Sequence, residues 1–171
     1  MINSANIEIP YEFASSNVEL SWADIKFGIG SNFLVENDAI THAVNELSKE
    51  ESPSSDLESL AFLFKGEDIE PFLTNLSTLE HENENAIKEK WLYLLLKWIF
   101  EHKDSLYKNF LDVVEHVYAD FDYPHIIAGL IKYMPNENTS KYNATGENLL
   151  LEVWGDYLRK QDILYNNRYK I

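Results

Sequence analysis

The sequence contains no cysteine among its 171 residues. Disulfide bonds, thiolate metal ligands and a cysteine nucleophile are therefore excluded for this chain. A chain without disulfides fits a reducing compartment. The first residues, Met1 to Asn6, also lack the basic start and the apolar run of a signal peptide. From these absences we expect a cytoplasmic protein.

Long apolar runs are missing as well. The longest run, Trp91 to Leu96, is followed at once by Lys97, whereas a membrane-spanning helix needs about 20 apolar residues. We therefore expect no membrane segment. The 4 Trp, 10 Tyr and 9 Phe residues argue against disorder, because disordered acidic chains are poor in aromatic residues. The composition indicates a folded chain with a substantial core.

Basic residues are scarce, with 14 Lys and Arg against 29 Asp and Glu, so the net charge is −15. The imbalance lies in residues 1–86, which hold 17 acidic residues and 3 lysines. Contact with nucleic acid or with an anionic membrane is disfavoured, because both need clustered positive charge. A basic protein partner is favoured, since opposite fields steer encounter. The alternative is that the charge serves only solubility.

Apolar residues recur at helical spacing along most of the chain. Leu57, Leu60 and Phe64, for example, fall on one helical face. Ser21 and Asp24 stand three residues apart, as in a capping box, and predict a helix start. The helices expected from such patterns cover residues 21–30, 36–49, 55–66, 69–76, 85–102, 105–117, 124–134 and 146–163.

The segment 85–102 is apolar on nearly every side, so we expect a buried central helix there. Strands do not alternate with helices along the sequence. The predicted fold is all-α, an irregular multi-helix bundle of about eight helices around that central helix, forming a single domain over residues 1–171. Residues 1–20 are expected to form an extended N-terminal arm. A polar loop is expected at 136–145 and a frayed tail at 166–171.

Signals for catalysis are few. No phosphate-binding loop or nucleophile elbow occurs, and Gly28 and Gly30 are followed by Phe33 where a dinucleotide-binding motif needs its third glycine. The five histidines show no zinc-binding spacing. Asp120 and Asp122 lack the glycine and the glutamate of a calcium loop. We therefore expect no catalytic residue, no metal and no cofactor, and a protein that is not an enzyme.

Carboxylates in the predicted loops and first helical turns are the candidate residues for binding a basic partner. Glu80, Glu82 and Glu84 precede the central helix, and we expect them to complement its dipole. The full candidate set is Glu36, Asp38, Glu50, Glu51, Glu67, Asp68, Glu80, Glu82 and Glu84.

Three segments carry a resemblance to a known family: Trp22–Gly28, Lys90–Leu95 and Tyr118–Pro124. Over about residues 20–160 the chain resembles a bacterial family of small helical proteins of unknown function. Small acidic proteins of this kind are similar to immunity proteins, which neutralise secreted toxins. The resemblance implies a bacterial, cytoplasmic and non-enzymatic protein, and it carries over no catalytic residue.

Our leading hypothesis is an immunity protein whose acidic surface masks the basic active site of a toxin domain, such as a nuclease. The alternative is a small-molecule-binding or regulatory domain, with a pocket near Trp22 and the N-terminal arm. A third hypothesis is an enzyme that uses carboxylates and histidines converging in one cleft.

Overall fold

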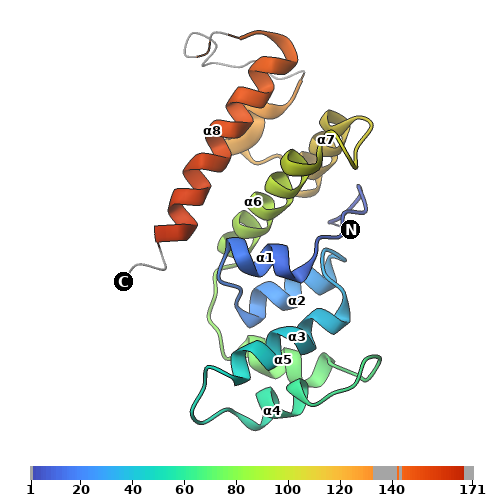
Figure 1. The fold of residues 1–171 in the computed structure, drawn as a ribbon, viewed down its shortest axis with the longest axis vertical. Helices are drawn as coiled ribbons and strands as arrows, with labels where there is room; N and C mark the ends of the chain where they lie inside the picture. The colour runs from blue at the N-terminus through green and yellow to red at the C-terminus, as the bar shows by residue number, and fades with distance from the viewer. Residues whose placement is uncertain (1, 133–141, 143, 168–171) are drawn as a thin grey trace. The chain divides into compact units, whose positions relative to one another are not determined.

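The computed structural model describes residues 2–132, 142 and 144–167. Their regular elements are all helices, and no strand occurs in these ranges (Figure 1). The predicted all-α, multi-helix fold is confirmed. Internal contacts divide the chain into an N-terminal unit, Asn6–Trp91, and a C-terminal unit formed by Met1–Ala5 with Leu92–Ile171. The expectation of a single domain stays a prediction.

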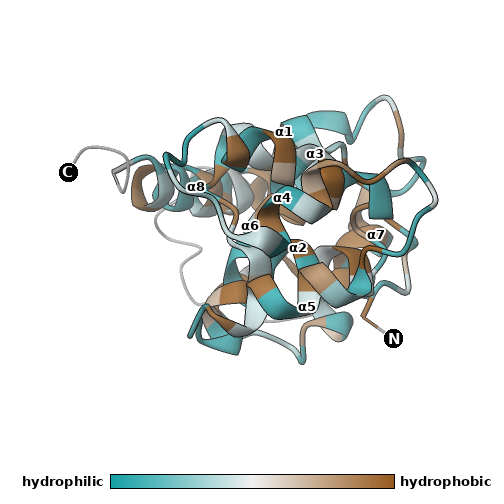
Figure 2. Cartoon of the chain, turned by 90° about the horizontal axis from the view of Figure 1, so that it is seen from below, coloured by the Kyte–Doolittle hydropathy of each residue, from teal (hydrophilic) through white to brown (hydrophobic). Residues whose placement is uncertain are grey.

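The N-terminal unit is a closed cycle of short helices. Helix α2 contacts α3, α3 contacts α4, α4 contacts α5, and α5 returns to α2. Polar and apolar residues alternate along these helices (Figure 2), so each can turn one face to a shared core. The bounds are α1 Tyr11–Asn17, α2 Trp22–Gly30, α3 Glu36–Leu47, α4 Ser55–Ala61 and α5 Glu70–Thr78.

The predicted extended arm is wrong over Tyr11–Asn17, where the chain forms α1. Ala14 lies on the buried side of this helix, and Val18, which follows it, is buried too. A helix of two turns is too short to show a helical period in the sequence. The segment before it, residues 2–10, is neither helix nor strand and turns at Ser4 and Ala5, and the Ile9 N–H donates to the Phe33 carbonyl at 3.0 Å.

Helix α4 is shorter than predicted. Ser54 caps it, because the Ser54 hydroxyl accepts the Leu57 N–H at 3.2 Å. The helix ends at Ala61 and does not continue to Gly66. Phe64, which the spacing predicts on the inner face, therefore lies beyond the end of the helix.

Helix α6, Glu84–His102, is the long apolar helix that the sequence predicts. Its residues from Lys90 to Leu96 are all buried, and so is Ile99. Its buried residues in the N-terminal unit are Ile87, Lys90 and Trp91, and those from Leu92 onward belong to the C-terminal unit. None of the described helices combines the length and the apolar character that crossing a lipid bilayer requires.

In the C-terminal unit, a 3-10 helix, η1, His125–Leu130, contacts both α7, Phe110–Asp120, and α8, Gly146–Asn167. The helix predicted over 124–134 is therefore a short 3-10 helix, and Met134 lies outside the described residues. Helix α7 starts five residues later than predicted. Trp154 of α8 fills the core of this unit.

Two terminal and loop predictions fall largely outside the described ranges. Helix α8 continues to Asn167, so the predicted frayed tail is wrong at residues 166–167, and 168–171 are not described. Of the predicted polar loop 136–145, residues 142, 144 and 145 are described, and none of them is helical.

Gly28 packs directly against Trp91. A Cβ at this position would lie 2.4 Å from Cζ2 and 2.7 Å from Cη2 of Trp91, and the Trp91 side chain is fully buried. We predict that Gly28→Ala lowers the free energy of unfolding by about 1–3 kcal/mol, because the indole cannot move away. Urea denaturation measures this change.

Gly30→Ala is the matched control, since an added Cβ at Gly30 meets no atom within 4 Å. Its unfolding free energy should stay unchanged or rise slightly. Equal stability of the Gly28→Ala and Gly30→Ala variants would contradict the packing described for α2.

His42 of α3 is buried and hydrogen-bonded. Its Nδ1 lies 2.9 Å from the Tyr11 hydroxyl, which also accepts a hydrogen bond from Nδ2 of Asn45 at 3.3 Å. Trp22 packs edge-on against the imidazole, with 4.6 Å between the ring centroids. The tyrosine hydroxyl thus donates to a neutral imidazole, and burial lowers the pKa of His42 to about 4.

The lowered pKa of His42 makes the stability depend on pH. Below its ordinary pKa of 6.5 the unfolded chain binds a proton at this residue, whereas the folded chain remains neutral down to about pH 4. Stability should fall by about 3 kcal/mol as the pH falls through this window. The measurement is the difference in unfolding free energy between the wild type and His42→Gln across the window, with NMR titration of the imidazole. A His42 that titrates near 6.5 would refute the assignment.

Candidate functional site

A capping box begins α2, as the sequence predicts. The Ser21 hydroxyl accepts the Asp24 N–H at 3.1 Å, and Oδ2 of Asp24 accepts the Ser21 N–H at 2.9 Å. The reciprocal bonds satisfy two backbone donors at the start of the helix. Asp24 is fully buried, so this cap lies in the interior of the unit.

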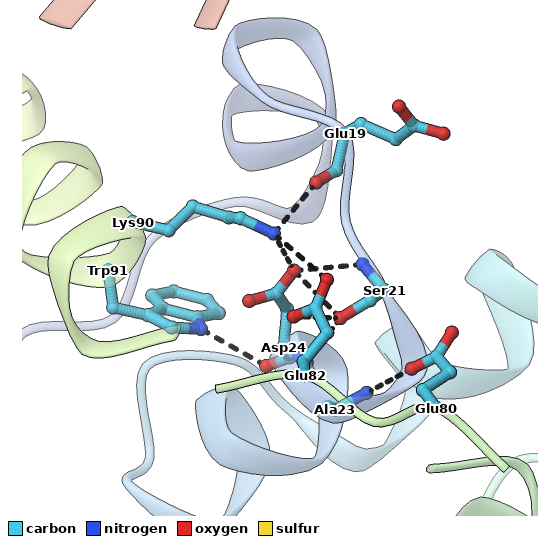
Figure 3. Close-up of polar contacts among 8 residues, drawn as sticks. All are labelled: Glu19, Ser21, Ala23, Asp24, Glu80, Glu82, Lys90 and Trp91. Atoms are coloured by element: carbon cyan, nitrogen blue, oxygen red, sulfur yellow. Dashed lines mark hydrogen bonds and ion pairs between the residues drawn. The ribbon is translucent and has the colours of Figure 1, made fainter. Parts of the chain in front are cut away.

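The side chain of Lys90, on α6, reaches the Asp24 carboxylate at this cap (Figure 3). Its ammonium group forms an ion pair with Asp24, donates to the Glu19 carbonyl at 3.2 Å and lies 3.9 Å from Oε1 of Glu82. The neighbouring Trp91 donates its indole N–H to the Asp24 carbonyl at 3.1 Å. Only 8% of the Lys90 side chain is exposed. A single lysine is thus shared by two carboxylates and a backbone carbonyl.

The loop between α5 and α6 supplies two of the predicted carboxylates to the start of α2. Oε2 of Glu80 accepts the Ala23 N–H at 2.9 Å, and Oε2 of Glu82 accepts the Ser21 hydroxyl at 2.9 Å. Both carboxylates therefore complement the positive end of α2. The prediction that they serve the dipole of the following helix is wrong; Glu84 alone lies in the first turn of α6.

Burial dominates the electrostatics of this cluster. Desolvation raises the pKa of Asp24 by more than the positive charge of Lys90 lowers it. Desolvation also raises the pKa of Glu80, although backbone N–H groups lower it. Oδ1 of Asp24 is buried without a hydrogen-bond partner among the described atoms. The arrangement joins the start of α2, the α5–α6 loop and α6, and its role is to position these elements.

The sequence predicts Asp24 as part of a cap but does not predict its pairing with Lys90. A signal was present, because Lys90 shares one helical face with the apolar residues Ile87 and Leu94. A lysine on a buried face needs a buried carboxylate. The location of that carboxylate, 66 residues earlier, could not be read from local spacing.

The nine predicted binding carboxylates do not gather in one cluster. Glu80 and Glu82 meet at α2, whereas the others lie at the start of α3, in the α3–α4 loop, in the α4–α5 loop and at the start of α6. Figure 1 shows the α3–α4 and α4–α5 loops on opposite sides of the N-terminal unit. The acidic groups are therefore distributed over its surface.

Besides Glu80, three of these carboxylates accept backbone N–H groups. Asp38 accepts from Val35 at 2.9 Å, Glu67 from Phe64 at 2.6 Å, and Asp68 from Glu70 at 3.0 Å. These bonds stabilise turns and helix starts, and they also fix the three carboxylates in position. By contrast, no ion pair or hydrogen bond within the described part of the chain engages the exposed side chains of Glu36, Glu50 and Glu51.

A serine, a histidine and an aspartate meet in the C-terminal unit. The Ser4 hydroxyl donates to Oδ2 of Asp120 at 2.9 Å and lies 3.4 Å from Nδ1 of His116. In a nucleophilic triad the histidine stands between the other two residues. Here the serine donates directly to the carboxylate, so this group anchors the N-terminal segment on α7. No group of three or more potential metal ligands occurs in the part of the chain that was described.

A shallow groove of about 670 Å³ lies in the C-terminal unit. Arg159 on its wall is ion-paired with Asp156. Trp22, near which the alternative hypothesis placed a small-molecule pocket, is buried against His42. Ligand binding near Trp22 stays a prediction. The groove is lined by Phe100, Ala144, Thr145, Asn148, Leu151, Glu152, Gly155 and Arg159.

Removing the buried lysine should be far more costly than removing an exposed one. We predict that Lys90→Met lowers the free energy of unfolding by about 3–5 kcal/mol at neutral pH, because Asp24 is left buried without a counter-charge. The loss should shrink at acidic pH, where Asp24 takes up a proton. Chemical denaturation at two pH values measures both effects.

Lys49→Met is the control, because Lys49 pairs with Glu46 at 2.6 Å but is 66% exposed. It should cost less than about 1 kcal/mol. Similar losses for the Lys90 and Lys49 variants would contradict the role given to the buried pair.

The family comparison matches residues 11–162 to the family described as "Uncharacterized protein conserved in bacteria (DUF2247)". The match includes all three segments on which the sequence resemblance was based. No curated protein and no solved structure gives a significant match to the chain. Since the matched region spans most of the sequence, the chain belongs to this bacterial family, DUF2247.

Proposed function

We propose that the chain is a non-catalytic, cytoplasmic binding protein, an immunity protein whose acidic N-terminal unit neutralises a basic toxin domain. The observation that carries the proposal is the charge of this unit. Residues 6–91 hold 18 acidic residues and 5 lysines, a net charge of −13. The rest of the chain holds 11 acidic and 9 basic residues.

The lysines of the N-terminal unit pair with only a few of its carboxylates, so most of its negative charge stays available to a partner. Four of the five pair with carboxylates of the same unit, three of them at 2.6–3.7 Å and the fourth in the buried pair with Asp24. Most of the other carboxylates are exposed. The unit therefore presents a negative field that attracts a cationic protein.

The distribution of the carboxylates favours steering over a single contact patch. Charges spread over several loops add to a long-range field, which mainly raises the association rate. A toxin that acts on nucleic acid carries a basic active site. Binding of the acidic unit over such a site would exclude the nucleic acid and thereby stop the reaction.

The proposal predicts that reversing the carboxylates that have no local structural role slows association. We expect the triple variant Glu36→Lys, Glu50→Lys and Glu51→Lys to bind its toxin domain more slowly at low salt, on the order of tenfold. The dissociation rate should change little. Stopped-flow kinetics at low and high salt measure this against a purified basic toxin domain.

The matched control reverses three exposed carboxylates of the C-terminal unit, Glu101, Glu147 and Glu152. This variant has the same net charge but should associate nearly as fast as the wild type. Equal slowing by both variants would show that only total charge matters. An association rate unaffected by either variant would refute the proposed function.

A further inference from the structure

Two phenylalanines are exposed in the segment that follows α4. Phe62 is 74% exposed and Phe64 is 79% exposed. Phenylalanine is among the residues most often found inside proteins. Two such rings separated by one residue form an apolar site in a surface that is otherwise strongly charged, and such sites commonly mark interaction surfaces.

The backbone around these phenylalanines is held in place by hydrogen bonds. The Phe64 N–H donates to Oε2 of Glu67 at 2.6 Å, and the Glu67 N–H returns to the Phe64 carbonyl at 3.1 Å. Gly66 completes this turn with φ of +92°, which other residues rarely adopt. The Phe62 N–H donates to the Glu58 carbonyl at 3.1 Å. Because the turn is preorganised, binding a partner would cost less conformational entropy.

The charges beside the two rings indicate the kind of partner. Glu58, Glu67 and Asp68 are exposed next to them, and the only basic neighbour in the segment is Lys65. A second copy of the chain would bring a unit of the same −13 charge. An anionic lipid surface would be repelled as well. A protein with basic residues around an apolar pocket fits both the rings and their surroundings.

We propose that Phe62 and Phe64 are the anchor residues through which the N-terminal unit docks onto a basic protein. The inference deepens the proposed function and rests on it. Aromatic residues at the centre of an interface carry much of the binding energy, and the surrounding polar groups exclude water. The exposed carboxylates accelerate encounter, and the two rings determine how long the complex lasts.

The first experiment identifies what contacts the anchor residues. A photoreactive benzophenone side chain replaces Phe64 in the full-length chain, and the source cells are irradiated. The expected product is a cross-link to a protein of net positive charge. The control position is Val44 on α3, which is 50% exposed in the same unit and should give no such product. Cross-linking to a second copy, to lipid, to an acidic protein or to nothing at position 64 overturns the inference.

The second experiment measures affinity for that basic protein after purification. Phe62→Ala and Phe64→Ala should each weaken binding, and Phe64→Ala by roughly 30-fold or more, mainly through faster dissociation. Val44→Ala should leave the affinity unchanged. Because the rings are exposed, thermal unfolding of both variants should match the wild type, so a loss of binding would not reflect misfolding.

The outcomes separate the inference from the function on which it rests. If the phenylalanine variants bind normally while reversal of Glu36, Glu50 and Glu51 slows association, the anchor site is wrong and the acidic binding protein stands. If neither set changes binding, both proposals fail. Faster dissociation of the phenylalanine variants, together with slower association of the charge variants, supports both.

Discussion

The ion pair between Lys90 and Asp24 is the interaction on which the N-terminal unit depends. Moving two charges out of water costs several kcal/mol for each ion, and hydrogen bonds around the pair offset part of that cost. The capping box supplies donors to Asp24, while Glu82 and the Glu19 carbonyl surround the ammonium group. The beginning of α2 is thereby fixed against α6, and Trp91 is held beside Gly28, where an added Cβ would have no room.

The parts of the fold that local chemistry determines could be predicted from the sequence. The cap at Ser21 depends on residues three apart, and α6 has enough apolar residues to reveal its burial. Helix α1 could not be predicted, because seven residues give too little periodicity and its stability comes from packing. The early end of α4 and the late start of α7 likewise depend on the neighbours that the folded chain provides.

Charge was predictable in amount but not in placement. Composition alone located the excess in the first half of the chain, since counting needs no structure. Whether a carboxylate is free or engaged depends on the backbone groups that folding brings to it. Asp38, Glu67 and Glu80 look alike in the sequence as exposed acids, yet each accepts a backbone N–H. The exposure of Phe64 was missed for a related reason, because its spacing matched a helix that ends before reaching it.

The continuity of α6 has a practical consequence for dissecting the protein. The boundary between the units falls between Trp91 and Leu92, in the middle of one helix. A fragment cut there would leave its final carbonyl groups without intrahelical donors, and the last turn, which contains Lys90, would unravel. Any excised N-terminal fragment should therefore extend to His102. The apolar residues exposed on that extension would have to be replaced by polar ones to keep the fragment soluble.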